Sequence, residues 1–418
     1  MTISISALEQ SIHAALQVAE VHEDALRCPV PVVWEIMTSE KSHHLQVWPG
    51  EEGNETLTLR ASEHIWQHVF EPVPAPGFQS LGALRRQCDG FTLEGQPQVI
   101  AQALPFIERL IEACRLKINH SQPEISWDKS VLAHITGSYL AINGDSSDWV
   151  YAEQSGHSNQ PALLMLHTAG ADARQWHGLM GQSALREQWR MHAFDLPGHG
   201  RSPLPTGTAN WNWRLTEANY EKWVLSYMDA AGLEKATLMG CSMGSAISLS
   251  LLAKYADRFY GAVLLEAPYC SGGRRSVYLN HSQVHSARLS AAWVGSLLSP
   301  TSGKAHRDQA TWIYSQGAPG VYDGDLAYYS DDFDAHDHTA SIDTSRTPVW
   351  LFTGNYDYSA TPADSAKVAA EIKGSHFQEL HGFGHFPMVE SPVELTPYLL
   401  PALKSIQANI PSLQKGST

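Results

Sequence analysis

The segment ATLMGCSMGSAISLSLLAKYA, residues 236–256, carries the clearest structural signal in the sequence. The apolar run ATLM predicts a buried strand, and the apolar stretch after Gly244 predicts a helix. Between them lies the sequence Gly240-Cys241-Ser242-Met243-Gly244, a G-x-S-x-G pattern. A turn this tight leaves no room for a Cβ at either glycine, because the backbone packs closely there. The pattern therefore predicts a strand, a strained turn and a helix, with Ser242 as a candidate nucleophile.

Two later segments offer the partners that a nucleophilic serine needs. Asp357 lies in GNYDYSATP (354–362), directly after the predicted strand PVWLFTG. His385 lies in HGFGHFPMVESP (381–392), in a short loop before a final helix. A serine hydroxyl is a poor nucleophile near neutral pH, so a base must remove its proton. We expect His385 to be that base and Asp357 to orient it.

Each of these two assignments has an alternative nearby. His381 could serve as the base, and Asp364 could serve as the acid. The positions relative to the strand end and the loop glycine favour Asp357 and His385. Cys241 precedes the nucleophile position, so we expect a buried structural thiol rather than a cysteine nucleophile.

From about residue 132 onward, apolar runs that do not alternate are separated by helical stretches. Such runs are typical of a parallel sheet covered on both faces. A strand pair is predicted first, at 138–142 and 149–153. The apolar runs follow at residues 162–170, 191–200, 236–239, 261–268 and 348–354.

The order Ser242, Asp357, His385 and the match of residues 195–202 to D-x-P-G-x-G-x-S identify a resemblance. Residues 132–412 resemble the α/β-hydrolase superfamily. The resemblance implies an α/β fold with a mostly parallel, doubly wound sheet and an inserted cap. It also implies a serine hydrolase that needs no cofactor.

In this superfamily, backbone N–H groups stabilise the oxyanion. One is expected from Met243, the residue after the nucleophile. The other is expected from the loop at 167–170, with Ala169 the favoured donor. That loop commonly reads His-Gly, whereas Thr168 stands here in place of the glycine. We expect His167 to be a structural histidine that bonds to the loop.

The long segment 269–347 is rich in aromatic residues and histidine, as an active-site cap often is. Its residues Trp312, Tyr314 and Tyr322, together with His167 and Thr168, are candidates for the substrate pocket. The sequence His336-Asp337-His338 lies in an acidic stretch that is typical of a solvated surface. We therefore expect no metal ligands.

The N-terminal part shows a different pattern of predicted strands and helices. Residues 1–118 predict a small α+β accessory domain, followed by a linker at 119–131. Short strand-like runs are followed by a helix at 96–115 with apolar residues at spacings of three and four. The order of elements resembles the sterol-carrier-protein-2 fold. Such domains bind apolar ligands or mediate dimerisation, so a homodimer is one expected assembly.

Composition excludes several functional classes. With 28 Lys+Arg against 43 Asp+Glu, the formal charge is −15, and no basic cluster occurs, so nucleic acid is not an expected partner. No apolar stretch reaches the roughly 18 residues of a membrane span. Five scattered cysteines and an N-terminus unlike a signal peptide favour a cytoplasmic location.

Three functions remain. The first is hydrolysis of a carboxylic ester or thioester of a small apolar molecule through an acyl-enzyme on Ser242. The second is hydrolysis of a carbon–carbon bond in a ketone or dicarbonyl substrate by the same residues, since one scaffold supports both reactions. The third is a non-catalytic ligand-binding receptor.

Overall fold

The structure is a computed structural model that describes residues 4–50, 55–121, 128–142, 148–209 and 212–411. Residues 122–127 of the predicted linker lie outside these ranges. The chain divides into two compact units. Unit 1 comprises Met1–Ser126, Val277–Ser315 and Tyr356–Tyr358, and unit 2 comprises Trp127–Ser276, Gln316–Asn355 and Ser359–Thr418.

Unit 2 is built on an eight-stranded sheet in the order β12-β11-β10-β9-β7-β8-β6-β5. Neighbouring strands are parallel except where β6 pairs with β5 and β8. The sheet is thus mostly parallel, as predicted. Its strands are β5 (Thr136–Ile142), β6 (Asp148–Ser155), β7 (Ala162–Leu166), β8 (Arg190–Phe194), β9 (Ala236–Cys241), β10 (Phe259–Leu265), β11 (Val349–Gly354) and β12 (His376–Leu380).

The central strands are buried along their whole length, which is why their apolar residues do not alternate with polar ones. All residues of β7 and β9 are buried. Because the strands on either side are parallel, β9 and β10 end at the same edge of the sheet. The loops that follow β7, β9, β10, β11 and β12 carry the candidate functional side chains.

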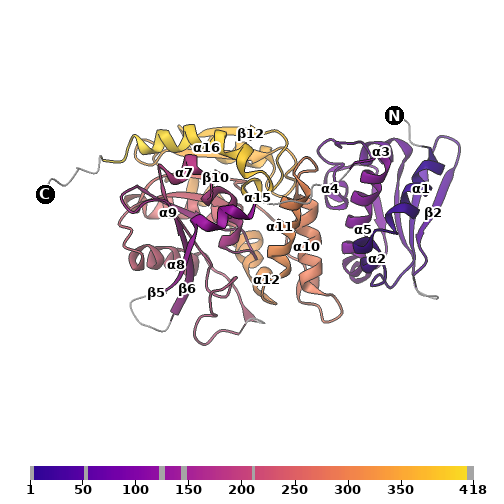
Figure 1. Ribbon diagram of the computed structural model, residues 1–418, viewed down its shortest axis with the longest axis horizontal. Coiled ribbons are helices and arrows are strands. Elements are labelled where there is room, and N and C mark those ends of the chain that lie inside the picture. Colours follow the sequence, from indigo (N-terminus) through magenta and orange to yellow (C-terminus); the bar gives the residue numbers. More distant parts are fainter. Residues whose placement is uncertain (1–3, 51–54, 122–127, 143–147, 210–211, 412–418) are drawn as a thin grey trace. The chain divides into compact units, whose positions relative to one another are not determined.

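Helices of unit 2 cover both faces of this sheet (Figure 1). One group contains α16, which packs on α6, α7 and β10, and the other contains α8 and α9, with α9 also packed on β10. The helices are α6 (His177–Met180), α7 (Ser183–Arg186), α8 (Glu217–Ala230), α9 (Met243–Lys254), α12 (Val321–Leu326), α13 (His336–Thr339), α14 (Pro362–Glu371), α15 (Pro387–Glu390) and α16 (Pro392–Gln407).

Unit 1 contains a separate four-stranded sheet in the order β2-β1-β3-β4. Helix α5 buries the predicted apolar face, including Ala103, Leu104 and Ile107. The elements of its N-terminal part are α1 (Ile5–Ala15), α2 (Ala19–Ala25), β1 (Val32–Met37), β2 (Ser42–Trp48), β3 (Leu57–Ser62), α3 (Glu63–Val69), α4 (Leu81–Gln87), β4 (Thr92–Glu94) and α5 (Pro97–Ile118).

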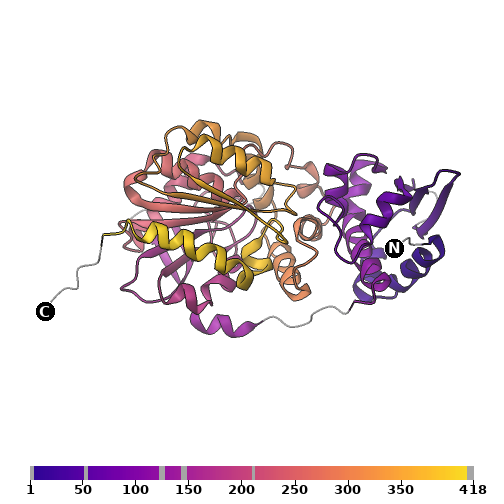
Figure 2. The ribbon, with the colours of Figure 1, turned by 90° about the horizontal axis from the view of Figure 1, so that it is seen from above.

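Two helices from the predicted cap also belong to unit 1. Helices α10 (Ser286–Leu297) and α11 (Lys304–Ser315) pack against each other, and α10 packs on α4 and α5. Figures 1 and 2 show these orange helices beside the purple helices of the N-terminal part. Ser80 Oγ donates to the carbonyl of Ser296 at 2.7 Å, and Arg288 pairs with Asp24 at 3.0 Å. Unit 1 is therefore assembled from segments far apart in the sequence.

Within the described residues, no helix combines the length and the apolar character needed to cross a membrane.

Candidate active site

The turn after β9 has the backbone conformation that the sequence predicts. Ser242 has φ 54° and ψ −113°, and its N–H donates to the carbonyl of Leu265 at 3.0 Å. A Cβ on Gly240 would lie 2.2 Å from the Gly244 carbonyl oxygen, and one on Gly244 would lie 2.2 Å from that of Leu166. Both glycines are thus required by close backbone contacts, and the turn holds Ser242 in a strained conformation.

Ser242 and His385 lie within hydrogen-bond distance of each other. Oγ of Ser242 is 2.9 Å from Nε2 of His385, and both residues are buried. The loop that carries His385 is fixed by the buried carboxylate of Glu390, in α15. This carboxylate accepts the N–H groups of Gly384 at 3.1 Å and Phe386 at 2.8 Å, on either side of the histidine. The geometry is that of a nucleophile and its base.

Two buried carboxylates lie near this pair. Asp357 follows β11 by three residues, and Glu266 follows β10 directly. One carboxylate oxygen from each and one ring nitrogen of His385 lie within 4.8 Å of one another. Glu266 has a positive φ of 50°, and its carboxylate accepts the N–H of Gly354 at 3.0 Å. The cluster thus brings two buried carboxylates near the imidazole whose Nε2 faces Ser242.

The two alternative residues are engaged elsewhere. Asp364 forms a capping box at the start of α14, where it accepts the N–H of Thr361 at 3.0 Å and its hydroxyl at 2.8 Å. His381 has a side chain that is 80% exposed and lies 3.6 Å from Glu379. Neither geometry leaves the group aimed at Ser242.

Backbone N–H groups around the turn differ in whether they have an acceptor. Thr168 N donates to Oε1 of Gln175 at 3.1 Å, and Gly170 N donates to Asp325 at 2.8 Å. Between them, the N–H of Ala169 has no acceptor within the described part of the chain, and the same holds for Met243 N at the start of α9. Ala169 N and Met243 N are the two donors that the sequence predicts for an oxyanion, and that role stays a prediction.

His167 is a neutral, structural histidine. Its Nδ1–H donates to the carbonyl of Thr168 at 2.9 Å, and its Nε2 accepts the N–H of Leu196 at 3.2 Å. A second ring proton, on Nε2, would break the hydrogen bond from the N–H of Leu196. Burial, with a smaller contribution from the charge of His199, lowers the pKa of His167 to about 4. The ring therefore shapes the loop and does not transfer protons near neutral pH.

Helix α12 contacts the same loop at Gly170. Asp325 is fully buried and accepts hydrogen bonds from Gly170 N, from Nε2 of His199 at 2.6 Å and from the indole of Trp213 at 3.0 Å. A Cβ on Gly170, whose φ is 71°, would lie 2.6 Å from the ring of Tyr322. Tyr322, a predicted pocket residue, thus packs directly on the loop.

The pair formed by His199 and Asp325 is buried and charged. Nδ1 of His199 faces the carbonyl of Pro197 at 3.1 Å while Nε2 faces the carboxylate, so both ring nitrogens donate. Burial alone would lower the pKa of His199, but the carboxylate of Asp325 outweighs burial and raises it. Asp325 therefore ties α12 to two loops beside Ser242.

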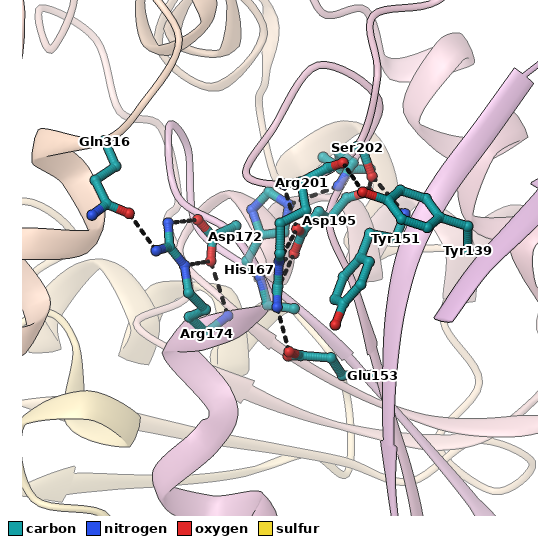
Figure 3. A network of polar contacts seen from close by, with 12 residues as sticks. Tyr139, Tyr151, Glu153, His167, Asp172, Arg174, Asp195, Arg201, Ser202 and Gln316 are labelled. Carbon is teal, nitrogen blue, oxygen red and sulfur yellow. Dashed lines mark hydrogen bonds and ion pairs between the residues drawn. The ribbon is translucent and has the colours of Figure 1, made fainter. Parts of the chain in front are cut away.

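A second polar network supports these loops (Figure 3). Asp195 accepts the N–H of Ala173 at 2.9 Å and the N–H of Arg201 at 2.8 Å. The guanidinium of Arg201 pairs with Asp195 and with Glu153, which also receives His177 at 2.8 Å. The D-x-P-G-x-G-x-S segment (195–202) thus holds the neighbouring loops in place through Asp195 and Arg201.

The other residues that the sequence analysis singled out, the pocket candidates Thr168, Trp312 and Tyr314 and the thiol of Cys241, do not belong to this network. Thr168 donates its hydroxyl to Gln175 at 3.0 Å. Trp312 and Tyr314 lie on α11 in unit 1, where Trp312 lines a groove of about 640 Å³ and Tyr314 is buried. Cys241 is buried, and its thiol donates to the carbonyl of His385.

The two histidines near residue 337 do not converge on one point. His336 pairs with Glu371 at 3.2 Å, and His338 pairs with Glu217 at 3.1 Å.

Sequence reasoning did not identify three buried carboxylates: Glu266, Asp325 and Glu390. A signal exists for Glu266, because a lone acid ends the apolar run GAVLLEAP at the edge where parallel strands end. Glu390 lies five residues after His385, in the same quoted segment. No sequence pattern distinguishes Asp325 from the other acids of its helix.

Residues 161–392, more than half of the chain, match the family described as alpha/beta hydrolase fold. The chain belongs to this family. Two solved structures agree with the fold of this α/β hydrolase. A hydrolase from Pseudomonas aeruginosa aligns with a TM-score of 0.56 at 21% identity, over 64% of this chain and 98% of that one. An enol-lactonase from Burkholderia xenovorans aligns with a TM-score of 0.54 at 21% identity, over 65% and 100%.

Curated relatives match over shorter regions. A 3-oxoadipate enol-lactonase from Acinetobacter baylyi is 34% identical over 106 residues, which are 25% of this chain and 36% of the relative. A pimeloyl-[acyl-carrier protein] methyl ester esterase from Aeromonas hydrophila is 29% identical over 26% of this chain and 39% of the relative. The chain thus spans less than two fifths of the length of these relatives.

Proposed function

We propose that this α/β hydrolase cleaves a carboxylic ester of a small molecule through an acyl-enzyme on Ser242. The observation that carries the proposal is the 2.9 Å separation between Ser242 Oγ and His385 Nε2 at a strained, buried turn. The names of relatives, an enol-lactonase and a methyl ester esterase, support an ester as the bond cleaved.

In the proposed reaction, His385 Nε2 takes the proton of Ser242 as its oxygen attacks the ester carbonyl. The carbonyl oxygen becomes negatively charged and accepts the N–H groups of Ala169 and Met243. His385 then gives the proton to the leaving alcohol. Water, deprotonated by the same nitrogen, attacks the acyl-enzyme and releases the acid.

Asp357 is the proposed acid of the triad. It is 1% exposed and lies in the cluster with His385 described above. An ionised carboxylate there would hold the Nδ1 proton in place and stabilise the imidazolium that forms during attack. Its replacement by asparagine would favour the wrong tautomer.

The test compares the wild type with Ser242→Ala on p-nitrophenyl butyrate and with a fluorophosphonate probe. We expect the variant to lose turnover by at least about a thousandfold and to lose labelling, with an unchanged circular dichroism spectrum. Cys241→Ala is the matched control, because the thiol precedes the nucleophile in the same turn. Labelling that persists in Ser242→Ala but disappears in Cys241→Ala would overturn the proposal.

A further inference from the structure

Two histidines face each other on the exposed side of α3, in unit 1. His64 and His68 are four residues apart, so a helix places them on one face. Their Nε2 atoms are 3.2 Å apart, and the rings meet edge to face. The opposite side of the helix, with Ile65, Trp66 and Val69, is buried.

Glu71 fixes the protonation of one ring. Nδ1 of His68 lies 2.9 Å from Oε1 of Glu71. Since an ionised carboxylate can only accept, Nδ1 carries a proton, and in the neutral imidazole Nε2 is then the nitrogen with the lone pair. A carboxylate that accepts the far N–H of a histidine is the usual outer partner of a metal-bound imidazole.

We propose that His64 and His68 bind one divalent transition-metal ion through their Nε2 atoms, with Glu71 orienting His68. A nitrogen–metal distance of about 2.0–2.1 Å would place the ion between the two nitrogens at an N–metal–N angle of about 100°. That angle lies between the square-planar and tetrahedral values, so neither ring has to move far.

Imidazole nitrogens favour Zn²⁺, Ni²⁺ and Cu²⁺ over Mg²⁺ and Ca²⁺, and Cu²⁺ should bind most tightly of the divalent series. Within the described residues, no third His, Cys, Asp or Glu atom joins the pair within 4.8 Å. The ion would therefore keep positions open for water or an added ligand. This inference is independent of the ester hydrolase, and it departs from the expectation of no metal ligands.

The experiment is a titration of the untagged, full-length, metal-free chain with Zn²⁺ by calorimetry, with Cu²⁺ followed by its visible absorption. We expect one ion per chain at this site and at least a tenfold loss of affinity in His64→Ala and in His68→Ala. Glu71→Gln should weaken binding by about 10-fold to 100-fold, as removal of an outer partner does.

His43→Ala/His44→Ala is the matched control, because it removes two adjacent histidines of β2 that do not lie on one helical face. This variant should bind like the wild type. Thermal unfolding with and without Zn²⁺ gives a second readout, since an ion that binds the folded chain raises Tm. Equal affinity and equal Tm shift in the wild type and in His64→Ala/His68→Ala would show an adventitious ion only, and would overturn the proposal.

Discussion

The carboxylate of Asp325 accepts the backbone N–H of Gly170 at 2.8 Å, next to Ala169, whose N–H has no acceptor among the residues that the structure describes. The bond takes up the N–H of Gly170, the residue after the proposed oxyanion donor Ala169. In the proposed reaction, a residue of α12 would therefore help to set which N–H of the loop meets the oxyanion.

We expect Asp325→Asn to lower kcat by about 10-fold to 100-fold with a smaller change in KM, because a misplaced donor weakens mainly the transition state. Steady-state kinetics on a p-nitrophenyl ester would measure the change. Asp323→Asn, on the same helix and paired with Arg275, is the control. A kcat for Asp325→Asn equal to that of this control would contradict the assignment.

Glu390→Gln tests the loop that carries His385. The glutamine amide keeps one oxygen that can accept a backbone N–H. Its NH₂ group, however, would face the other backbone N–H, which the carboxylate of the wild type accepts. We expect about a tenfold loss of kcat and slower fluorophosphonate labelling of Ser242, because His385 is held less firmly. The exposed Glu394→Gln, in α16, should leave both rates unchanged. Wild-type labelling in Glu390→Gln would argue against a positioning role.

Glu266→Gln removes a negative charge that lies within 4.8 Å of a ring nitrogen of His385. The amide can still accept the N–H of Gly354. Loss of the charge makes the imidazolium less favourable, so we expect a fall in kcat of one to two orders of magnitude. Steady-state kinetics on a p-nitrophenyl ester would measure the change. The exposed Glu379→Gln is the control, and a kcat for Glu266→Gln equal to that of this control would show that the Glu266 charge plays no part.

Gly244→Ala should destabilise the fold by about 3 kcal/mol or more, because the new Cβ would meet the backbone oxygen of Leu166 at 2.2 Å. Gly272→Ala is matched to it, since a Cβ there meets no atom within 4 Å. Urea unfolding of both variants measures the difference. Equal urea midpoints for Gly244→Ala and Gly272→Ala would contradict the prediction, because they would mean that the turn can make room for the added Cβ without cost.

Acid should unfold unit 2 partly through His167. Its pKa falls from 6.5 to about 4 on folding, so between these values the unfolded chain binds more protons than the folded one. The stabilisation is complete above about pH 6.5 and is lost as the pH falls toward 4. It amounts to about 3 kcal/mol at most. Urea midpoints measured from pH 7 to 4 should fall less steeply in His167→Gln, and an equal slope would contradict this origin.

The sequence predicted the strand, turn and helix around Ser242 and the loop of His385 because both rest on local patterns. A strand period, two glycines and a histidine before a helix are visible in a short window. The availability of Ala169 N is different, since it depends on Gln175 and on Asp325, which lies 155 residues beyond Gly170. The grouping of α10 with α5 also depends on long-range packing that periodicity does not encode.

Unit 1 is discontinuous, and this has a consequence for synthesis. Its helices α10 and α11 leave the ribosome only after strands β5 to β10 of unit 2 have emerged. Until then α5 lacks its partner α10, and Asp24 lacks Arg288. The N-terminal part therefore exposes an apolar and charged surface, which α10 later covers, while most of the other sheet is being synthesised. A cut of the gene at the linker would separate α5 from α10 and divide unit 1, whereas all segments of unit 2 would stay on one piece.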